Sequence, residues 1–177
     1  MRREIRPEDL PTGKLVHFRE VEIGDAEFLL DLRTNPKKSQ FLNPTVNDLQ
    51  RQKLYIESYK ARQEDWYFVL EDKSGIAIGC IRIYNIEGNQ FTIGSWIMTE
   101  TAPELAGLEA TILTYQFAFE YLGLETCLFD VRKENRKVLR FHKLYGARVI
   151  SETELDFIFC FDRPDFGKMK ERFSSFV

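Results

Sequence analysis

Three apolar stretches in the middle of the chain are separated by polar turn sequences. Residues 66–71 (W-Y-F-V-L-E), 76–86 and 91–98 are rich in aromatic and β-branched residues, which are enriched in strands. The turn sequences D-K-S-G (72–75) and E-G-N (87–89) connect these stretches. Short turns between consecutive strands predict an antiparallel meander.

Two helices are predicted before this meander. The first begins after Asp25, a natural N-cap, and ends near Arg33. A polar loop leads to the second helix, which is expected over about residues 46–62 with Thr45 or Asn47 as its cap. The apolar residues at helical spacing are Phe28, Leu29 and Leu32 in the first helix and Leu49, Ile56 and Tyr59 in the second.

Two more helices are predicted after the meander. Residues 104–122 place their apolar side chains on one helical face, and Gly123 is a plausible C-cap. The members of this face are Leu108, Ile112, Tyr115, Phe119 and Leu122. Residues 134–145 form the other helix, which Gly146 ends.

Strands at 15–21, 126–131, 148–150 and 155–161 complete the order β-α-α-β-β-β-α-β-α-β-β. The unit of strand, long helix and strand in its centre implies a parallel crossover. The expected fold is therefore α/β: a mixed, mostly antiparallel seven-stranded sheet with a central parallel crossover and helices on both faces. A length of 177 residues favours a single domain over residues 1–177.

Composition narrows the class of protein. Lys plus Arg number 25 and Asp plus Glu number 28, so the net charge of −3 argues against broad binding of nucleic-acid backbones. No run approaches the ~18 apolar residues of a membrane span, and residues 1–14 lack the apolar core of a signal peptide. We therefore expect a cytoplasmic protein. The three cysteines are far apart in apolar runs, so we expect buried thiols and no metal site.

Three segments resemble the GCN5-related N-acetyltransferase (GNAT) family. Residues 131–147 (V-R-K-E-N-R-K-V-L-R-F-H-K-L-Y-G-A) are similar to the family pattern V-x-x-x-N-x-x-[SAV]-x-x-[FL]-[YH]-x-x-x-G-[FA]. F-R-E-V-E-I-G-D-A-E-F-L-L-D-L-R resembles the opening strand and helix, and I-G-S-W-I (93–97) resembles the fourth strand. The resemblance covers about residues 15–161. It implies an acetyl-CoA-dependent N-acetyltransferase acting on a primary amine.

The resemblance also implies where acetyl-CoA binds. Cofactor contacts are expected from the backbone of the fourth strand, from the start of the long helix and from the helix predicted over residues 134–145. These residues are Trp96, Ile97, Met98, Ala106, Gly107, Leu108, Asn135, Val138 and His142. The family's pyrophosphate loop, [QR]-x-x-G-x-[GA], falls on residues 102–107, where only Gly107 fits, and a register over 104–109 fits no better. Because this loop is degenerate, a non-catalytic acyl-CoA-binding or ligand-binding module on the same fold stays open.

His142 occupies the position at which many members of the family carry a tyrosine that protonates the leaving thiolate. Its ordinary pKa of ~6.5 suits proton transfer, but the ring can also serve only as packing under the cofactor. Tyr145, one turn away, could substitute or be a core aromatic. No general base is evident, and Glu100, with Glu87 and Glu109, is a candidate by its nearness to the fourth strand.

The resemblance places the acceptor between the first two helices and strands three and four. The candidates are Gln40, Phe41, Arg82, Tyr84 and Trp96, with Asn35 and Asn43 nearby. Arg82 interrupts an apolar strand, so it either binds a phosphate or carboxylate bidentately or lies on a solvated face. An aromatic pocket with one arginine favours a nucleotide-activated amino sugar of surface polysaccharide synthesis. The pattern is equally similar to the ribosomal-protein N-terminal acetyltransferase group, and a homodimer is also kept open.

Overall fold

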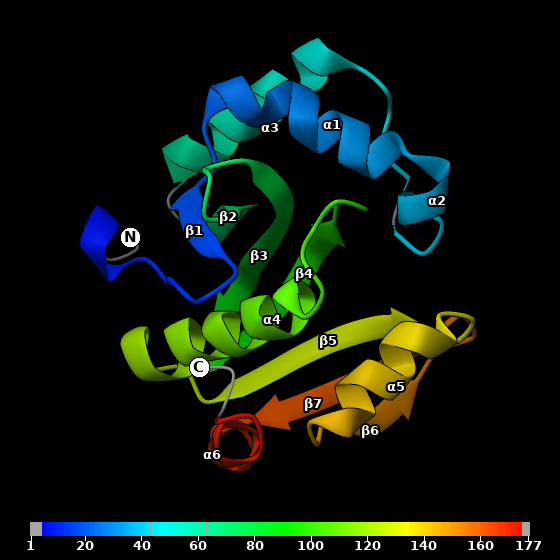
Figure 1. The fold of residues 1–177 in the computed structure, drawn as a ribbon. Helices are drawn as coiled ribbons and strands as arrows, with labels where there is room; N and C mark the ends of the chain where they lie inside the picture. Colours follow the sequence, from blue (N-terminus) through cyan, green and yellow to red (C-terminus); the bar gives the residue numbers. More distant parts are fainter. Residues whose placement is uncertain (1–4, 43, 63, 175–177) are drawn as a thin grey trace.

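The computed structural model describes residues 5–42, 44–62 and 64–174, and Figure 1 shows its arrangement. Within these ranges, seven strands form one sheet in the order β1-β2-β3-β4-β5-β7-β6. The strands are β1 (His17–Glu20), β2 (Trp66–Glu71), β3 (Ala77–Glu87), β4 (Gln90–Met98), β5 (Thr126–Arg132), β6 (Arg148–Glu152) and β7 (Asp156–Asp162). The pair β4–β5 is parallel, and the other neighbouring pairs are antiparallel. The predicted α/β fold with a central parallel crossover is confirmed.

Helices cover both faces of this sheet. The helices are α1 (Ala26–Thr34), α2 (Pro36–Ser39), α3 (Leu49–Arg62), α4 (Ala106–Gln116), α5 (Arg136–Leu144) and α6 (Arg163–Arg172). Buried residues of α4, α5 and α6 share one core with Trp66, Phe68 and Leu70 of β2. Buried residues of α1 and α3 share a second core with Tyr67 and Val69 of the same strand. Because strand side chains alternate between faces, this run of five apolar residues supplies both cores.

The ends of several elements differ from the prediction. Helix α3 begins at Leu49, and the side chain of Asp48, instead of Thr45 or Asn47, accepts a hydrogen bond from the amide of Arg51 at 3.0 Å. Leu49 itself is 38% exposed, so the first turn of α3 does not share the predicted apolar stripe. The predicted polar loop after α1 contains the short helix α2, whose cap is the Asn35 side chain.

The long helix is shorter and more deeply buried than its apolar pattern predicts. It begins at Ala106 and passes at residues 117–121 into a π-helical turn, η3 (Phe117–Tyr121), before Gly123 at φ +74°. Buried side chains occupy most of its circumference because the sheet lies on one side and α6 contacts another. Helix α6, which completes this packing, was not predicted.

The three cysteines are buried and form no disulfide, as the sequence predicted. Among the described residues, no group of three or more histidine, cysteine, aspartate or glutamate side chains is placed to hold a metal ion. No helix within those ranges combines the length and the apolar character needed to cross a membrane.

Candidate active site

Strands β4 and β5 separate soon after they meet, and a cavity lies where they separate. They pair only through Gln90 with Thr126 and Phe91 with Cys127 within the described residues, and Figure 1 shows the strands diverging beyond that point. The cavity has a volume of about 590 Å³. Its described lining comes from α1, α2, β3, β4, β5, α4 and α5, so both layers of helices contribute to it.

A β-bulge shapes the β4 side of the cavity. Strand β3 pairs Cys80 with Ile97 and Arg82 with Gly94, so β4 carries one extra residue between these pairs. Ser95 in the bulge has φ +50°, and its carbonyl accepts a hydrogen bond from the Cys80 thiol at 3.1 Å. The bulge therefore interrupts regular pairing where residues 95–98 line the cavity, which includes the predicted Trp96, Ile97 and Met98.

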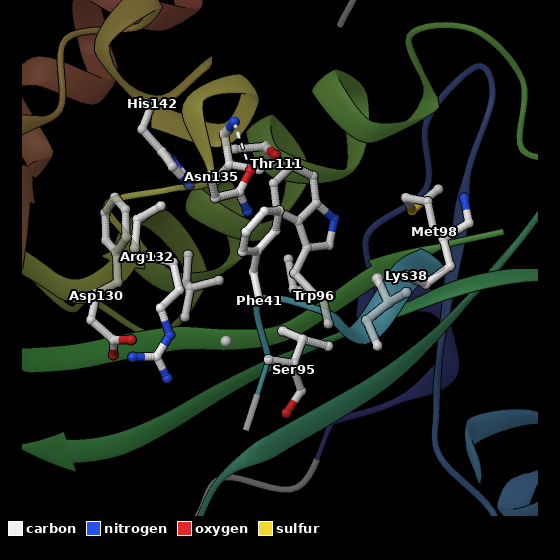
Figure 2. A pocket seen from close by; sticks show the side chains of 18 of the residues that line it. Lys38, Phe41, Ser95, Trp96, Met98, Thr111, Asp130, Arg132, Asn135 and His142 are labelled. Atoms are coloured by element: carbon white, nitrogen blue, oxygen red, sulfur yellow. Dashed lines mark hydrogen bonds between the residues drawn. The ribbon is translucent and has the colours of Figure 1, made fainter. Parts of the chain in front are cut away.

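Strand alternation divides the cavity into two halves. Phe129 of β5 faces α5, where its ring lies 4.5 Å from that of His142. Asp130 and Arg132 lie on the opposite face of β5, and Figure 2 shows their side chains pointing away from His142 and Asn135. We call the half beside α4 and α5 the donor half, and the half beside α1 and α2 the acceptor half.

The donor half contains three of the predicted cofactor residues of α5. Asn135 caps α5, because its side-chain oxygen accepts a hydrogen bond from the amide of Val138 at 3.3 Å, and both residues line the cavity. His142 also lines the cavity but is 8% exposed. Burial lowers the pKa of His142 to about 3, far below the near-neutral value that the sequence suggested. The ring is therefore neutral at physiological pH, and any hydrogen that it gives comes from a neutral imidazole.

Tyr145 lies behind His142 and not on the wall of the cavity. Its hydroxyl contacts Nδ1 of His142 and lies 3.1 Å from the hydroxyl of Tyr115. Tyr145 is buried, and burial raises its pKa. Its burial favours the other alternative from the sequence, a core aromatic, and Tyr145 is not among the described lining residues.

The start of α4 differs in part from the expected cofactor loop. Leu105 precedes it in the left-handed region at φ +70°, Ala106 is fully buried, and Gly107 and Leu108 are partly exposed. None of residues 106–108 is among the described lining of the cavity, to which α4 gives Thr111 and Tyr115. The first amides of a helix nevertheless lack partners within it, which makes a helix start a site for anions.

One buried donor in this half has no partner. The indole Nε1 of Trp96 is buried and makes no hydrogen bond among the described residues. The indole also lies close to the start of α4, since a Cβ added to Gly107 would be 3.5 Å from its ring. An unpartnered N–H, a helix start and a splayed strand fit the amide-rich and phosphate-rich chain of an acyl-CoA. The residues present therefore fit this group.

The acceptor half is lined by aromatic and basic side chains. Gln40, Phe41 and Tyr84, all predicted from the sequence, line this half, whereas the predicted Trp96 lines the cavity beside α5. The basic side chains of the acceptor half, which the sequence pattern did not single out, are Arg33, Lys37, Lys38 and Arg132. Lys137, near the start of α5, also lines the cavity. The signals were present in the P-K-K run after α1 and in the alternating F-D-V-R of β5. Asn35 lines a separate, shallower hollow, and Asn43 lies outside the described residues.

Arg82 does not reach the cavity. Its guanidinium forms an ion pair with the buried Asp65 and donates a hydrogen bond to the hydroxyl of Tyr55 at 2.5 Å. The guanidinium also lies 4.8 Å from the centre of the Tyr84 ring. Arg82 is paired with Asp65 and is not among the described lining residues, so its position gives no support to the expectation that it binds a substrate anion. Its place is behind Tyr84, where it supports the cavity wall.

The predicted carboxylates also lie elsewhere. Glu100 is exposed and lines the separate hollow beside Asn35, and Glu87 is exposed at the end of β3. Glu109 is buried, and its carboxylate accepts hydrogen bonds from the amides of residues 14–16 at 2.7 to 2.8 Å. None of the three is among the described lining residues, in which Asp130 is the single acid.

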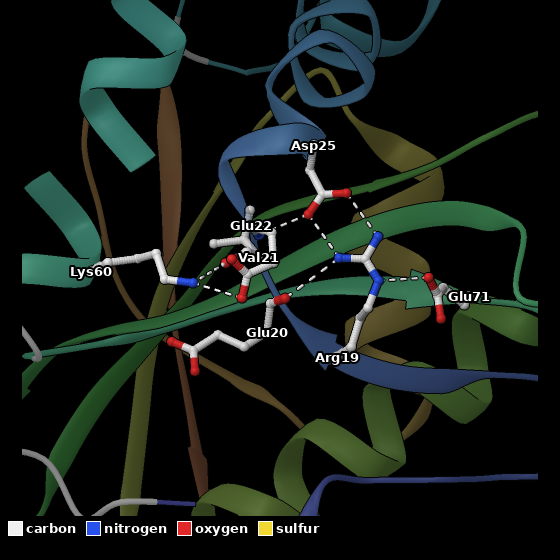
Figure 3. A network of polar contacts seen from close by, with 7 residues as sticks. All are labelled: Arg19, Glu20, Val21, Glu22, Asp25, Lys60 and Glu71. Carbon is white, nitrogen blue, oxygen red and sulfur yellow. Dashed lines mark hydrogen bonds and ion pairs between the residues drawn. The ribbon is translucent and has the colours of Figure 1, made fainter. Parts of the chain in front are cut away.

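An ion-pair network holds α1 in the position from which Arg33 reaches the cavity (Figure 3). Arg19 of β1 donates two hydrogen bonds of 2.7 Å to Asp25 before α1 and one of 2.5 Å to Glu71 of β2. Burial opposes ionisation of Asp25, but the hydrogen bonds from Arg19 and from the amide of Glu22 prevail and lower its pKa. The network thus joins the start of α1 to two strands.

Comparison with known families identifies the class of protein. Residues 16–148 match the profile of a family described as "Acetyltransferase (GNAT) domain". The chain therefore belongs to the GNAT acetyltransferase family, as its sequence resemblance predicted.

Two solved structures and one relative found by sequence are similar to this chain. A solved structure described as "Apo FdhC- a nucleotide-linked sugar GNAT" is 32% identical, covers 95% of this chain and 98% of its own, and superposes with a TM-score of 0.88. "Acetyltransferase PseH" of Campylobacter jejuni is 23% identical over 154 residues, which are 86% of this chain and 95% of that protein. Spermidine N-acetyltransferase of Vibrio cholerae in complex with CoA and spermine shares the fold, with 15% identity, a TM-score of 0.77 and coverage of 86% and 98%.

Proposed function

We propose that this protein transfers an acetyl group from acetyl-CoA to the primary amine of a nucleotide-linked amino sugar. The observation that carries the proposal is the acceptor half of the cavity. Arg33, Lys37 and Lys38 supply cationic donors suited to a diphosphate, and Arg132 adds a fourth charge although it is also paired with Asp156. Phe41 and Tyr84 supply aromatic faces. The similarity to FdhC, a protein described as a nucleotide-linked sugar GNAT, supports the same class of acceptor.

The donor half suits the acyl-CoA that the family uses. When bound, this group supplies a thioester carbonyl that an amine can attack. Backbone amides of the segment that follows Ser95 are the donors proposed to stabilise negative charge on the carbonyl oxygen. Trp96, Asn135 and Val138 line the space for the pantetheine chain, and the amides at Gly107 and Leu108 are proposed as donors to a phosphate.

His142 is proposed to hydrogen-bond the departing sulfur. Burial keeps its imidazole neutral, so one ring nitrogen carries a hydrogen and the other accepts one. If the Tyr145 hydroxyl donates to Nδ1, the ring hydrogen is on Nε2, which leaves that N–H free for the ligand. Tyr145 thus acts as a positioning residue for His142.

The charge of the acceptor half disfavours the alternative acceptor, a protein N-terminus. Four basic side chains and one acidic side chain line the acceptor half within the described residues. This excess of positive charge suits the anionic diphosphate of a nucleotide-linked sugar, whereas a peptide N-terminus is cationic and brings no such anion. A non-catalytic binding module would bind acyl-CoA without releasing thiol, so turnover separates that alternative from the proposal.

A screen of amine acceptors by free-thiol release tests the proposed function. The purified protein is given acetyl-CoA and one of four acceptors: a nucleotide-linked amino sugar, the same sugar without its nucleotide, spermidine, or a short peptide with a free N-terminus. We expect kcat/KM to be at least about 100-fold higher for the nucleotide-linked sugar, because the diphosphate contacts lower KM. Preference for the peptide or for spermidine would refute the proposed acceptor. If no acceptor leads to thiol release, enzymatic activity on these amines would be refuted.

A further inference from the structure

Asp130 is the single acidic side chain among the described residues that line the cavity. It projects from β5 into the acceptor half, beside Arg132 on the same strand (Figure 2). The side chain is exposed and makes no hydrogen bond or ion pair within the described part of the chain. Its neighbour differs, since Arg132 donates to Asp156 of β7 at 3.2 Å.

Tyr84 and Gly94 line the cavity together with Asp130. Tyr84 of β3 packs across Gly94 of β4, where an added Cβ would lie 2.8 Å from the phenolic oxygen. Glycine at this position therefore lets the phenol of Tyr84 reach across β4 toward β5. Burial, followed by the nearby charge of Asp130, raises the pKa of Tyr84, which is consistent with the two side chains facing one another.

The surroundings make this carboxylate the favourable place for a cation. The titratable groups around the acceptor half are Tyr84 from β3, Arg132 from β5, and Arg33, Lys37 and Lys38 from α1 and α2. Four of these are cationic and repel an ammonium group, whereas a carboxylate attracts it. An amine that enters as an ammonium ion must also lose a proton before its lone pair can attack.

We propose that Asp130 binds the ammonium group of the acceptor and accepts its proton, an inference that rests on the proposed N-acyltransfer. One N–H proton moves to the Asp130 carboxylate, and the freed lone pair forms the C–N bond to the acyl carbon while the C–S bond breaks. A second N–H proton ends on the thiol of CoA. The proton held by Asp130 passes to solvent, to which the side chain is exposed. The products are an amide, a thiol and one released proton.

Kinetics of Asp130→Asn, which keeps the shape and removes the charge, test this proposal. With the amine that the wild type acylates best, we expect kcat/KM for the amine to fall about 100-fold near pH 7, as general-base removal does. The loss should shrink toward pH 9, where the free amine is already neutral. KM for acetyl-CoA should stay unchanged, because Asp130 faces the acceptor half. Asp130→Glu should retain most of the activity, and Glu154→Gln, in the exposed β6–β7 turn, should match the wild type.

A binding measurement separates recognition of the ammonium from folding. Wild type should bind the amino sugar nucleotide more tightly than its hydroxyl analogue, and Asp130→Asn should bind the two equally while keeping the wild-type affinity for the analogue. Wild-type kcat/KM in Asp130→Asn at every pH would overturn the role of Asp130 and leave the proposed function intact. A wild type that prefers a different amine would overturn the proposed acceptor, and the role of Asp130 would then be decided by the same kinetics with that amine.

Discussion

His142 cannot take up a proton near neutral pH, because its ring is packed among aromatic side chains. Ring centres lie at 4.5 Å for Phe129, 5.9 Å for Phe159 and 6.3 Å for Trp96. Such surroundings disfavour the charged form, so burial lowers the pKa of His142 to about 3. A proposed role at the leaving sulfur therefore depends on the neutral ring and on Tyr145, which contacts Nδ1.

The depressed pKa of His142 predicts acid sensitivity of the fold. In the unfolded chain the imidazole titrates near ~6.5, so below that pH the unfolded chain binds a proton that the folded chain does not. The free energy of unfolding should therefore fall as the pH drops from about 6.5 toward 3. Between pH 6.5 and pH 4.5, the free energy of unfolding should fall by up to ~2 kcal/mol more in the wild type than in His142→Gln. Urea unfolding at both pH values measures this difference.

The exposed His17 provides the matched control for this measurement. His17→Gln should leave the pH dependence of the free energy of unfolding as it is in the wild type. An equal loss in the wild type and in His142→Gln would contradict the assignment of acid sensitivity to His142.

At the scale of elements, α4 has two roles: it anchors the segment before β1, and it lines the cavity. The buried Glu109 carboxylate accepts hydrogen bonds from the amides of Lys14, Leu15 and Val16 just before β1. Gly13 is required beside it, because the carboxylate occupies the space that a Cβ at this position would fill. Helix α4 therefore positions the entry to β1 while its other side chains, Thr111 among them, line the cavity.

Glu109→Gln tests this anchor. The amide NH₂ would face backbone N–H donors and leave at least one of them buried without an acceptor, so we expect a loss of about 3 kcal/mol in the free energy of unfolding. Glu57→Gln, on the exposed side of α3, should change it by less than ~0.5 kcal/mol. Chemical denaturation measures both, and equal stability of the two variants would show that the anchor contributes little.

At the scale of the whole molecule, the sheet is joined weakly at its centre. Two residue pairs connect β4 to β5 within the described residues, and the cavity occupies the space beyond them. A ligand in this cavity contacts residues of both strands and of helices on both faces. Ligand binding should therefore stabilise the two parts of the sheet together.

Thermal unfolding tests this coupling. At a concentration of 100 times its Kd, acetyl-CoA should raise the free energy of unfolding by about 2.7 kcal/mol, which corresponds to roughly 5–10 °C in Tm for a chain of this size. Free acetate at the same concentration should produce no shift. An unchanged Tm with saturating acetyl-CoA would contradict binding in the cavity and would also remove the basis for the proposed donor.

The sequence by itself determined the family and the order of the strands and of α1, α3, α4 and α5, but not α2 or α6. Local periodicity depends on neighbours within a few residues, so β2 was predicted with its observed bounds, and the pattern around Asn135 and His142 predicted a helix that lines the site. Most of the predicted cofactor and acceptor residues line the cavity, because the match to the family pattern aligned them with the family's site positions.

The tertiary structure alone decided which charged side chains face the cavity. Arg82 is ion-paired with Asp65, 17 residues before it, and Glu109 accepts hydrogen bonds from amides more than 90 residues away in the chain. Neither side chain is among the described lining residues. Asp130 faces the cavity because β5 separates from β4 and turns alternate side chains toward the acceptor half. Electrostatic interactions depend on distance and burial in space, which the order of residues along the chain does not specify.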